Sequence, residues 1–99
     1  MTPTLSIIVP IYNRIDVISS CVESVLQDGS SEFELILIDD LSTDNSFNFI
    51  KDINDPRVKI GQSKIRKNGN VARNLGAEMA RGKYLTFLDS DDIYLHDRI

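Results

Sequence analysis

The chain has 99 residues, of which 41% are hydrophobic and 26% charged, and this composition is typical of one soluble globular domain. Eleven basic and fifteen acidic residues leave a net charge of −4, which argues against a nucleic-acid-binding protein. One cysteine, Cys21, and one histidine, His96, exclude a disulfide scaffold and a zinc module. Cys21 lies in a periodic apolar segment and is expected in the core.

The apolar runs are short, and the longest, at residues 7–11, is far from the roughly 20 residues that a membrane-spanning helix needs. The first three residues also lack the basic start of a signal peptide. We therefore expect a cytoplasmic protein.

Four runs rich in β-branched and aromatic residues predict strands, at residues 5–11, 33–38, 57–60 and 84–88. The first two runs are apolar almost without interruption, which is typical of strands covered on both faces of a parallel sheet. We therefore predict an α/β fold with a Rossmann-like parallel sheet and helices on both faces.

Amphipathic segments between these strands predict three helices. The first covers residues 17–26, with Asp16 as its N-cap. The second is marked by apolar residues at 47, 50 and 53 and is stopped by Asp55-Pro56. The third is marked by apolar residues at 71, 75 and 79, with Gly82 as its C-cap. Small residues at 72, 76 and 80 predict that this third helix packs closely on its neighbour.

Ligands of open α/β sheets bind outside the carboxyl ends of the strands, and aspartates follow two of these strands. Asp39 and Asp40 follow the second strand, and Asp89-Ser90-Asp91 follows the fourth. Clustered carboxylates repel one another, so a divalent cation such as Mg²⁺ or Mn²⁺ would compensate them. The other interpretation of Asp39-Asp40 is turn chemistry, in which the side chains only satisfy backbone N–H groups.

The segment from residue 57 to 73 carries six of the eleven basic residues and no acidic one. Such a run is usually a solvated loop. Here it leads into the third helix, so that Arg73 would lie in the first helical turn, where a guanidinium and backbone N–H groups could face a diphosphate.

Four motifs resemble those of the family-2 glycosyltransferases of the GT-A fold, in the same order along the chain. They are residues 6–14 (SIIVPIYNR), 37–44 (LIDDLSTD), 68–76 (NGNVARNLG) and 87–92 (FLDSDD). The resemblance covers the whole chain and implies transfer of a sugar from a nucleoside-diphosphate sugar, expected to be a UDP-sugar, to a saccharide or another hydroxyl acceptor. Polysaccharide biosynthesis is the implied setting.

The resemblance also implies a role for each motif residue. Pro10 and Tyr12 would line the base pocket, Asp40 would read the base and Asp39 would brace its loop. Arg73 would approach the diphosphate. In the Asp-x-Asp motif, Asp89 and Ser90 would contact the ribose or the metal shell, and Asp91, with Asp89, would bind Mn²⁺ or Mg²⁺. Leu41 departs from the family, which usually has glycine or a small polar residue at this position.

In this family the acceptor-binding half and the catalytic base follow the Asp-x-Asp motif. The resemblance therefore implies that residues 1–99 form the nucleotide-sugar-binding half, that the base lies after Ile99 and that the 99 residues alone are inactive. Implied partners are the donor and a saccharide or lipid-linked saccharide acceptor, with membrane association at the inner face of the cell membrane and a homodimer as further options.

Three alternatives come from other classes of protein. A phospho-receiver domain also gathers aspartates around Mg²⁺, but its acid pair follows the first strand, where this chain has Tyr12-Asn13. A dinucleotide-dependent oxidoreductase would need Gly-x-Gly-x-x-Gly after that strand, and the motif is absent. The third alternative is a non-catalytic nucleotide-binding or interaction module, or an inactive truncation.

Overall fold

A computed structural model describes residues 3–27, 32–65 and 70–88 of the chain. Strands and helices alternate in it, in the order β1 (Leu5–Ile11), α1 (Ile18–Leu26), β2 (Phe33–Asp39), α2 (Ser46–Ile50), β3 (Val58–Gln62), α3 (Asn70–Met79) and β4 (Tyr84–Phe87). The predicted chain order is thereby confirmed.

The four strands form one parallel sheet in the order β3-β2-β1-β4. All seven residues of β2 are buried, as its nearly continuous apolar sequence predicted. The order contradicts the phospho-receiver alternative, because receiver-type sheets place β3 beside β1 rather than beside β2. It is the order of the dinucleotide-binding folds, in which the ligand crevice opens where the strand order reverses, here between β1 and β4.

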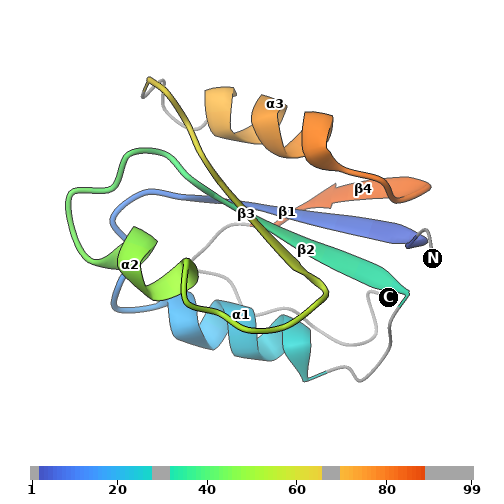
Figure 1. The fold of residues 1–99 in the computed structure, drawn as a ribbon, viewed down its shortest axis with the longest axis horizontal. Coiled ribbons are helices and arrows are strands. Elements are labelled where there is room, and N and C mark those ends of the chain that lie inside the picture. The colour runs from blue at the N-terminus through green and yellow to red at the C-terminus, as the bar shows by residue number, and fades with distance from the viewer. Residues whose placement is uncertain (1–2, 28–31, 66–69, 89–99) are drawn as a thin grey trace.

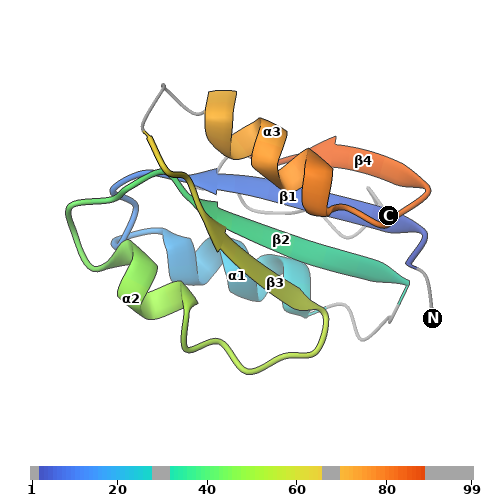
Figure 2. The same ribbon diagram turned by 45° about the horizontal axis from the view of Figure 1, so that its top comes forward.

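Helices cover both faces of this sheet, as predicted. Figures 1 and 2 show α1 and α2 on one face and α3 on the other. Alternate residues of β1 point to opposite faces, so that Ile7 and Val9 join the core under α1 while Ile8 packs against α3. Cys21 is 1% exposed in the α1 core, which confirms its predicted structural place.

Two predicted caps are wrong. Val17, not Asp16, is the N-cap of α1, because a turn precedes the helix and the N–H groups of Val17 and Ile18 both donate to the carbonyl of Arg14. Gly82 is not a helix cap either, since α3 ends at Met79. Glycine is required at residue 82 for another reason, because a Cβ there would lie 2.5 Å from Ser6 Oγ and 2.6 Å from its backbone nitrogen.

Other element boundaries shift by a few residues. Helix α2 ends at Ile50 rather than reaching Ile53, because the chain tightens there and the Ile53 N–H donates to the Ile50 carbonyl. Strand β3 runs on to Gln62, since its pairing with β2 continues until Gln62 lies opposite Asp39. Strand β4 ends one residue early, at Phe87.

The predicted close packing of α3 is confirmed and is centred on Gly76. A Cβ at this position would lie 2.4 Å from Ile8 Cγ2, well inside van der Waals contact. Ala72 is fully buried beside it, against Ile8, Ile36 and Ile38. The helix therefore lies directly on β1 and β2, and this contact fixes the position of its middle turn.

Replacing Gly76 with alanine should destabilise the chain, because the new methyl group collides with Ile8 in a packed interface. We expect a loss of about 1–3 kcal/mol in the free energy of unfolding, measured by urea denaturation, even though alanine favours helices. Asn74→Ala, at an exposed position of the same helix, serves as the control and should be neutral or slightly stabilising. Equal stability of Gly76→Ala and the parent chain would contradict the close contact.

Candidate functional site

The candidate site lies at the carboxyl ends of β1 and β2. Because the strands pair in register up to Ile11 and Asp39, the loops that follow them leave the sheet at the same level. The Asp40 N–H continues the ladder by donating to the Ile11 carbonyl at 2.7 Å. Tyr12 and Asp40 therefore leave the sheet side by side, beside the place where the strand order reverses.

Asp39 and Asp40 are both buried, with exposures of 0% and 1%. Asp39 Oδ2 accepts hydrogen bonds from the Ser42 N–H at 3.0 Å and from Gln62 Nε2 at 3.1 Å. These contacts brace the loop after β2. Asp39 Oδ1 is also buried and accepts no hydrogen bond from the residues that the structure describes. A buried carboxylate pair is costly unless donors or a cation compensate it, which makes this place a candidate binding site.

Asn13 locks the loops after β1 and β2 together. Its Oδ1 accepts hydrogen bonds from the backbone N–H groups of Thr43 at 2.7 Å and Asp44 at 3.2 Å, and its own N–H donates to Ser42 Oγ at 3.0 Å. Asn13 adopts a left-handed φ of 52°, which asparagine tolerates better than most residues. The sequence motif contained Asn13, but no role was predicted for it. An asparagine directly after a strand was the available signal.

Asp44 adds a second link between the same loops. Its Oδ1 accepts the Ser46 N–H at 2.8 Å and its Oδ2 accepts the Ile15 N–H at 3.2 Å. Burial acts to raise the pKa of Asp44, but the hydrogen bonds from Ser46 and Ile15 prevail and hold the pKa below its ordinary value. The ionised carboxylate is therefore part of the loop structure.

Leu41 has a left-handed φ of 60°. A side chain in this conformation crowds the following carbonyl, which costs about 1–2 kcal/mol in most residues and nothing in glycine. The departure from the family pattern therefore has a physical meaning, because Leu41 occupies a backbone position that favours glycine. The turn keeps its shape through the contacts of Asp39 and Asn13 on either side.

The remaining predicted site residues lie near this edge or outside the described residues. Pro10 is partly buried in β1, opposite Ile38 of β2. The pairing of β1 with β4 ends two residues earlier, at Ile8. Arg73 is partly buried in the first turn of α3, whose start lies at the carboxyl end of the sheet in Figure 1. Asp89, Ser90 and Asp91 are outside the described residues. The residue before them, Leu88, is 2% exposed and donates its N–H to the Ile8 carbonyl.

The six basic residues of segment 57–73 do not gather at one edge. Arg57 and Lys59 lie near the start of β3, at the opposite end of the sheet, and form ion pairs with Asp55 at 3.0 Å and Glu34 at 2.6 Å. Among the basic residues of this segment that the structure describes, Arg73 alone belongs to α3. Arg57 and Lys59 are therefore not part of a phosphate site at the carboxyl edge, whereas Arg73 stays a candidate.

The described residues contain no group of three or more metal-ligating side chains. Asp89 and Asp91, the predicted metal ligands, are not among them. The metal site therefore stays a prediction from the Asp-x-Asp motif.

The described part of the chain contains no helix that is long and apolar enough to cross a membrane.

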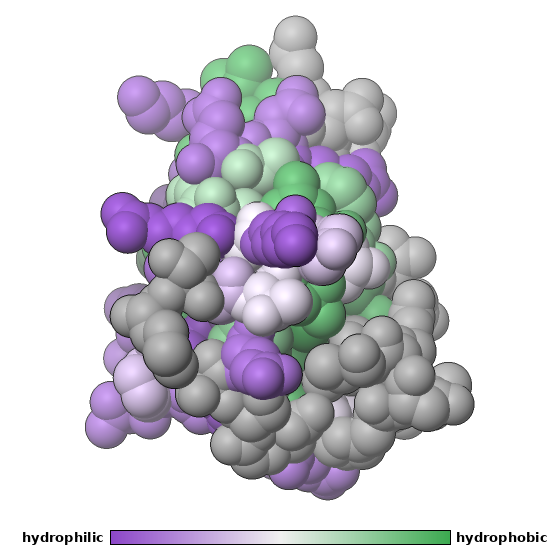
Figure 3. All heavy atoms as spheres, turned by 90° about the vertical axis from the view of Figure 1, so that its right-hand side faces the viewer, coloured by the Kyte–Doolittle hydropathy of each residue, from purple (hydrophilic) through white to green (hydrophobic). Residues whose placement is uncertain are grey.

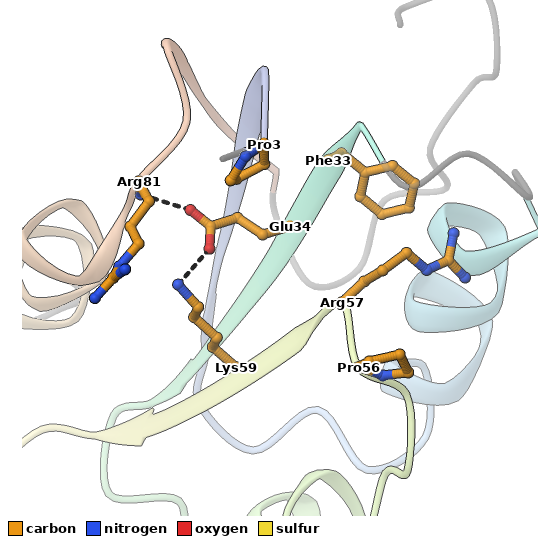
Figure 4. A pocket seen from close by; sticks show the side chains of 7 residues that line it. All are labelled: Pro3, Phe33, Glu34, Pro56, Arg57, Lys59 and Arg81. Carbon is orange, nitrogen blue, oxygen red and sulfur yellow. Dashed lines mark hydrogen bonds and ion pairs between the residues drawn. The ribbon is translucent and has the colours of Figure 1, made fainter. Parts of the chain in front are cut away.

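A pocket of about 480 Å³ lies at the amino end of the sheet, far from the candidate site. It is lined by Pro3, Phe33, Glu34, Pro56, Arg57, Lys59 and Arg81 (Figure 4). Figure 3, which views the molecule from this end, shows hydrophilic side chains over its middle beside apolar surface. Arg57 pairs with Asp55 and lies over the Phe33 ring, with 4.8 Å between the guanidinium carbon and the ring centroid. Glu34 pairs with Lys59, so both pairs are close to neutral.

The left-handed backbone at Leu41 predicts an unusual order of stability. Leu41→Gly should be more stable than Leu41→Ala by about 1 kcal/mol, because only glycine relieves the strain while both variants lose the leucine side chain. Chemical denaturation would measure the difference. The same pair of substitutions at Ser20, exposed on α1, should give the reverse order, with alanine about 1 kcal/mol above glycine. If Leu41→Ala were more stable than Leu41→Gly, the result would contradict backbone strain at residue 41.

The lowered pKa of Asp44 predicts that its contribution is lost in acid. As pH falls below the ordinary value of 3.8, the unfolded state takes up the proton first, and the folded state loses stability relative to it. Asp44→Asn should cost about 1–3 kcal/mol of unfolding free energy at pH 7 and clearly less at pH 3. Urea denaturation at both pH values measures this difference, and an equal loss at pH 7 and pH 3 would show that the charge of Asp44 is irrelevant.

Comparisons with known proteins agree with the fold. An uncharacterised glycosyltransferase of Haemophilus influenzae is 42% identical over 99 residues, which is 98% of this chain and 40% of that protein. The Escherichia coli protein WfaP, named a UDP-Glc:alpha-D-GlcNAc-diphosphoundecaprenol beta-1,3-glucosyltransferase, is 38% identical over 96% of this chain and 38% of its own length. The chain thus spans about two fifths of these relatives.

A solved structure shows the same architecture. Residues 1–349 of Staphylococcus aureus TarS in complex with UDP-GlcNAc superpose with a TM-score of 0.81 and 30% identity, over 89% of this chain and 26% of that one. The parallel sheet with helices on both faces is the GT-A fold of these glycosyltransferases. Residues 6–99 match the family described as Glycosyl transferase family 2, and the chain therefore belongs to that family.

Proposed function

We propose that this chain binds the donor in a glycosyltransferase that moves a sugar from a nucleoside-diphosphate sugar to a hydroxyl acceptor. The observation that carries the proposal is the buried Asp39-Asp40 pair, which lies at the carboxyl end of β2 beside the end of β1. Residues 1–99 would then form the nucleotide-sugar-binding half of the enzyme.

The base pocket would lie between the loops after β1 and β2. Pro10 and Tyr12 would line it, and Asp40 would accept a hydrogen bond from an N–H group of the base. Uracil offers such an N–H at N3, whereas cytosine has an acceptor there, so a carboxylate at this place favours UDP over CDP. The names of WfaP and of the TarS complex, which include UDP-Glc and UDP-GlcNAc, support this choice.

The diphosphate would lie beside the first turn of α3, where Arg73 supplies positive charge. Asp91 and Asp89 would hold Mn²⁺ or Mg²⁺, and Ser90 would approach the ribose or the metal shell. Carboxylate oxygens are the donors that these hard cations prefer, so the residues fit the group. When bound, the cation would stabilise the charge that develops on the departing nucleoside diphosphate.

The acceptor would bind to a part of the enzyme that follows residue 99. The catalytic base would lie there, and a saccharide or a lipid-linked saccharide would be the acceptor, as the name of WfaP indicates for that relative. The 99 residues would then bind the donor without turning it over. Sustained release of UDP from a UDP-sugar by these residues alone would contradict that division.

Calorimetry with UDP and Mn²⁺ tests the donor site. We expect metal-dependent binding by the parent chain and no metal dependence in Asp91→Ala. Asp40→Asn should weaken UDP binding by about ten-fold or more, because a hydrogen bond to a charged group is lost, and should narrow the preference for UDP over CDP.

Glu23→Gln, at an exposed position of α1, is the matched control and should bind as the parent chain does. Unchanged metal dependence in Asp91→Ala would remove Asp91 from the ligand set. A parent chain that binds no nucleoside diphosphate would contradict the proposed function and favour an interaction module or an inactive truncation.

A further inference from the structure

Another buried carboxylate, Glu34, joins four parts of the fold at the amino end of the sheet. Glu34, on β2, is 4% exposed. Its Oε2 accepts hydrogen bonds from Ser6 Oγ on β1 and from the Arg81 N–H, both at 2.6 Å, and its Oε1 pairs with Lys59 Nζ on β3 at 2.6 Å (Figure 4). Burial acts to raise the pKa of Glu34, but these partners prevail and lower it, so the group is ionised.

Arg81 and Gly82 belong to the segment that connects α3 to β4. The Gly82 N–H donates to Ser6 Oγ at 2.7 Å, next to the bond between the Arg81 N–H and Glu34. Two successive backbone N–H groups are therefore fixed to the sheet directly after α3. Gly82 also lies so close to Ser6 that the connection has no room for a Cβ at this position.

Helix α3 is held on the sheet by the apolar packing of one face, which includes the buried Ala72, and by a polar attachment directly after its end. Gly76 rests on Ile8 near the middle of the helix, and the connection at residues 81–82 is held by Glu34 and Ser6 beyond its end. The apolar packing sets the distance between helix and sheet, and the polar attachment beyond the helix end restrains its direction. Arg73 lies on the other side of Gly76 from this attachment, so that a tilt would move it relative to the sheet.

We propose that Glu34 is a positioning residue for the donor site, because the hydrogen bonds that it accepts set the direction of α3 and thereby the place of Arg73. This inference rests on the proposed function, in which Arg73 contacts the diphosphate. The base pocket lies on the loops after β1 and β2, which Glu34 does not touch. Loss of the attachment should therefore affect diphosphate binding and spare binding of the nucleoside.

Two double variants separate the accepted hydrogen bonds from the ion pair. Glu34→Gln with Lys59→Met removes both charges but keeps a side-chain oxygen for the Arg81 N–H. Glu34→Leu with Lys59→Met removes the same charges and the acceptor as well. Neither double variant leaves an unpaired buried charge. The two variants therefore differ mainly in whether residue 34 can accept the hydrogen bond from the segment after α3.

The readout is the affinity for UDP divided by the affinity for uridine, measured by calorimetry with Mn²⁺. The Gln/Met variant should keep the ratio of the parent chain, and the Leu/Met variant should lower it by about ten-fold, since a displacement on the order of 1 Å misplaces a binding group. In a chain that already carries Arg73→Ala, the Leu/Met change should not lower the ratio further. If Leu/Met does not fold, Ser6→Ala removes the Gly82 attachment instead and should lower the ratio.

A folded Leu/Met variant, or Ser6→Ala in its place, with the UDP-to-uridine ratio of the parent chain would overturn the positioning role and leave the proposed function intact. An equal loss of UDP and uridine binding would also overturn it, because that pattern indicates general destabilisation. If the parent chain binds uridine but gains nothing from the diphosphate, Arg73 has no such contact and both proposals fail.

Discussion

The parallel pairing of β1 with β2 is the constraint on which the rest of the structure depends. Its register, from Leu5 opposite Phe33 to Ile11 opposite Asp39, places two loops at one level at the carboxyl end of the sheet. A slip of one strand by one residue would turn its side chains to the other face of the sheet and place the two loops at different levels. Asn13 can bridge to the loop after β2 only because this register brings it there. The same pairing places Ser6 beside Glu34 at the opposite end.

Most of the fold could be predicted from the sequence because its strands are unambiguous. Residues 5–11 and 33–38 are apolar on both faces, which is characteristic of buried parallel strands. The errors occur where tertiary contacts override local preference. Gln62 is a weak strand former, yet pairing with β2 extends β3 to it. Asp16 is a good N-cap by residue type, yet a turn bonded to the Arg14 carbonyl begins the helix first.

The motifs located the candidate site, but the sequence could not reveal how it is supported. Asp39 and Asp40 were identified by their place after a strand, whereas the contacts of Asn13 and Gln62 join segments 23 to 31 residues apart. In the sequence, Glu34 is one residue of a predicted strand, with no sign of a special role. Only the fold shows that its buried carboxylate links three strands with the segment after α3. Net charge was equally uninformative, because Lys59 serves this cluster rather than a phosphate.

The central claim is that the donor binds at the carboxyl end of the sheet and not in the pocket at its amino end. The most direct measurement is a titration of the ¹⁵N-labelled chain with UDP and Mg²⁺, followed through the NMR shifts of the backbone amides. The amides of Tyr12, Asp40 and Arg73 should shift together with one dissociation constant, while those of Phe33 and Lys59 stay in place. Shifts confined to Phe33, Lys59 and their neighbours would place the nucleotide at the wrong end of the sheet and contradict the claim.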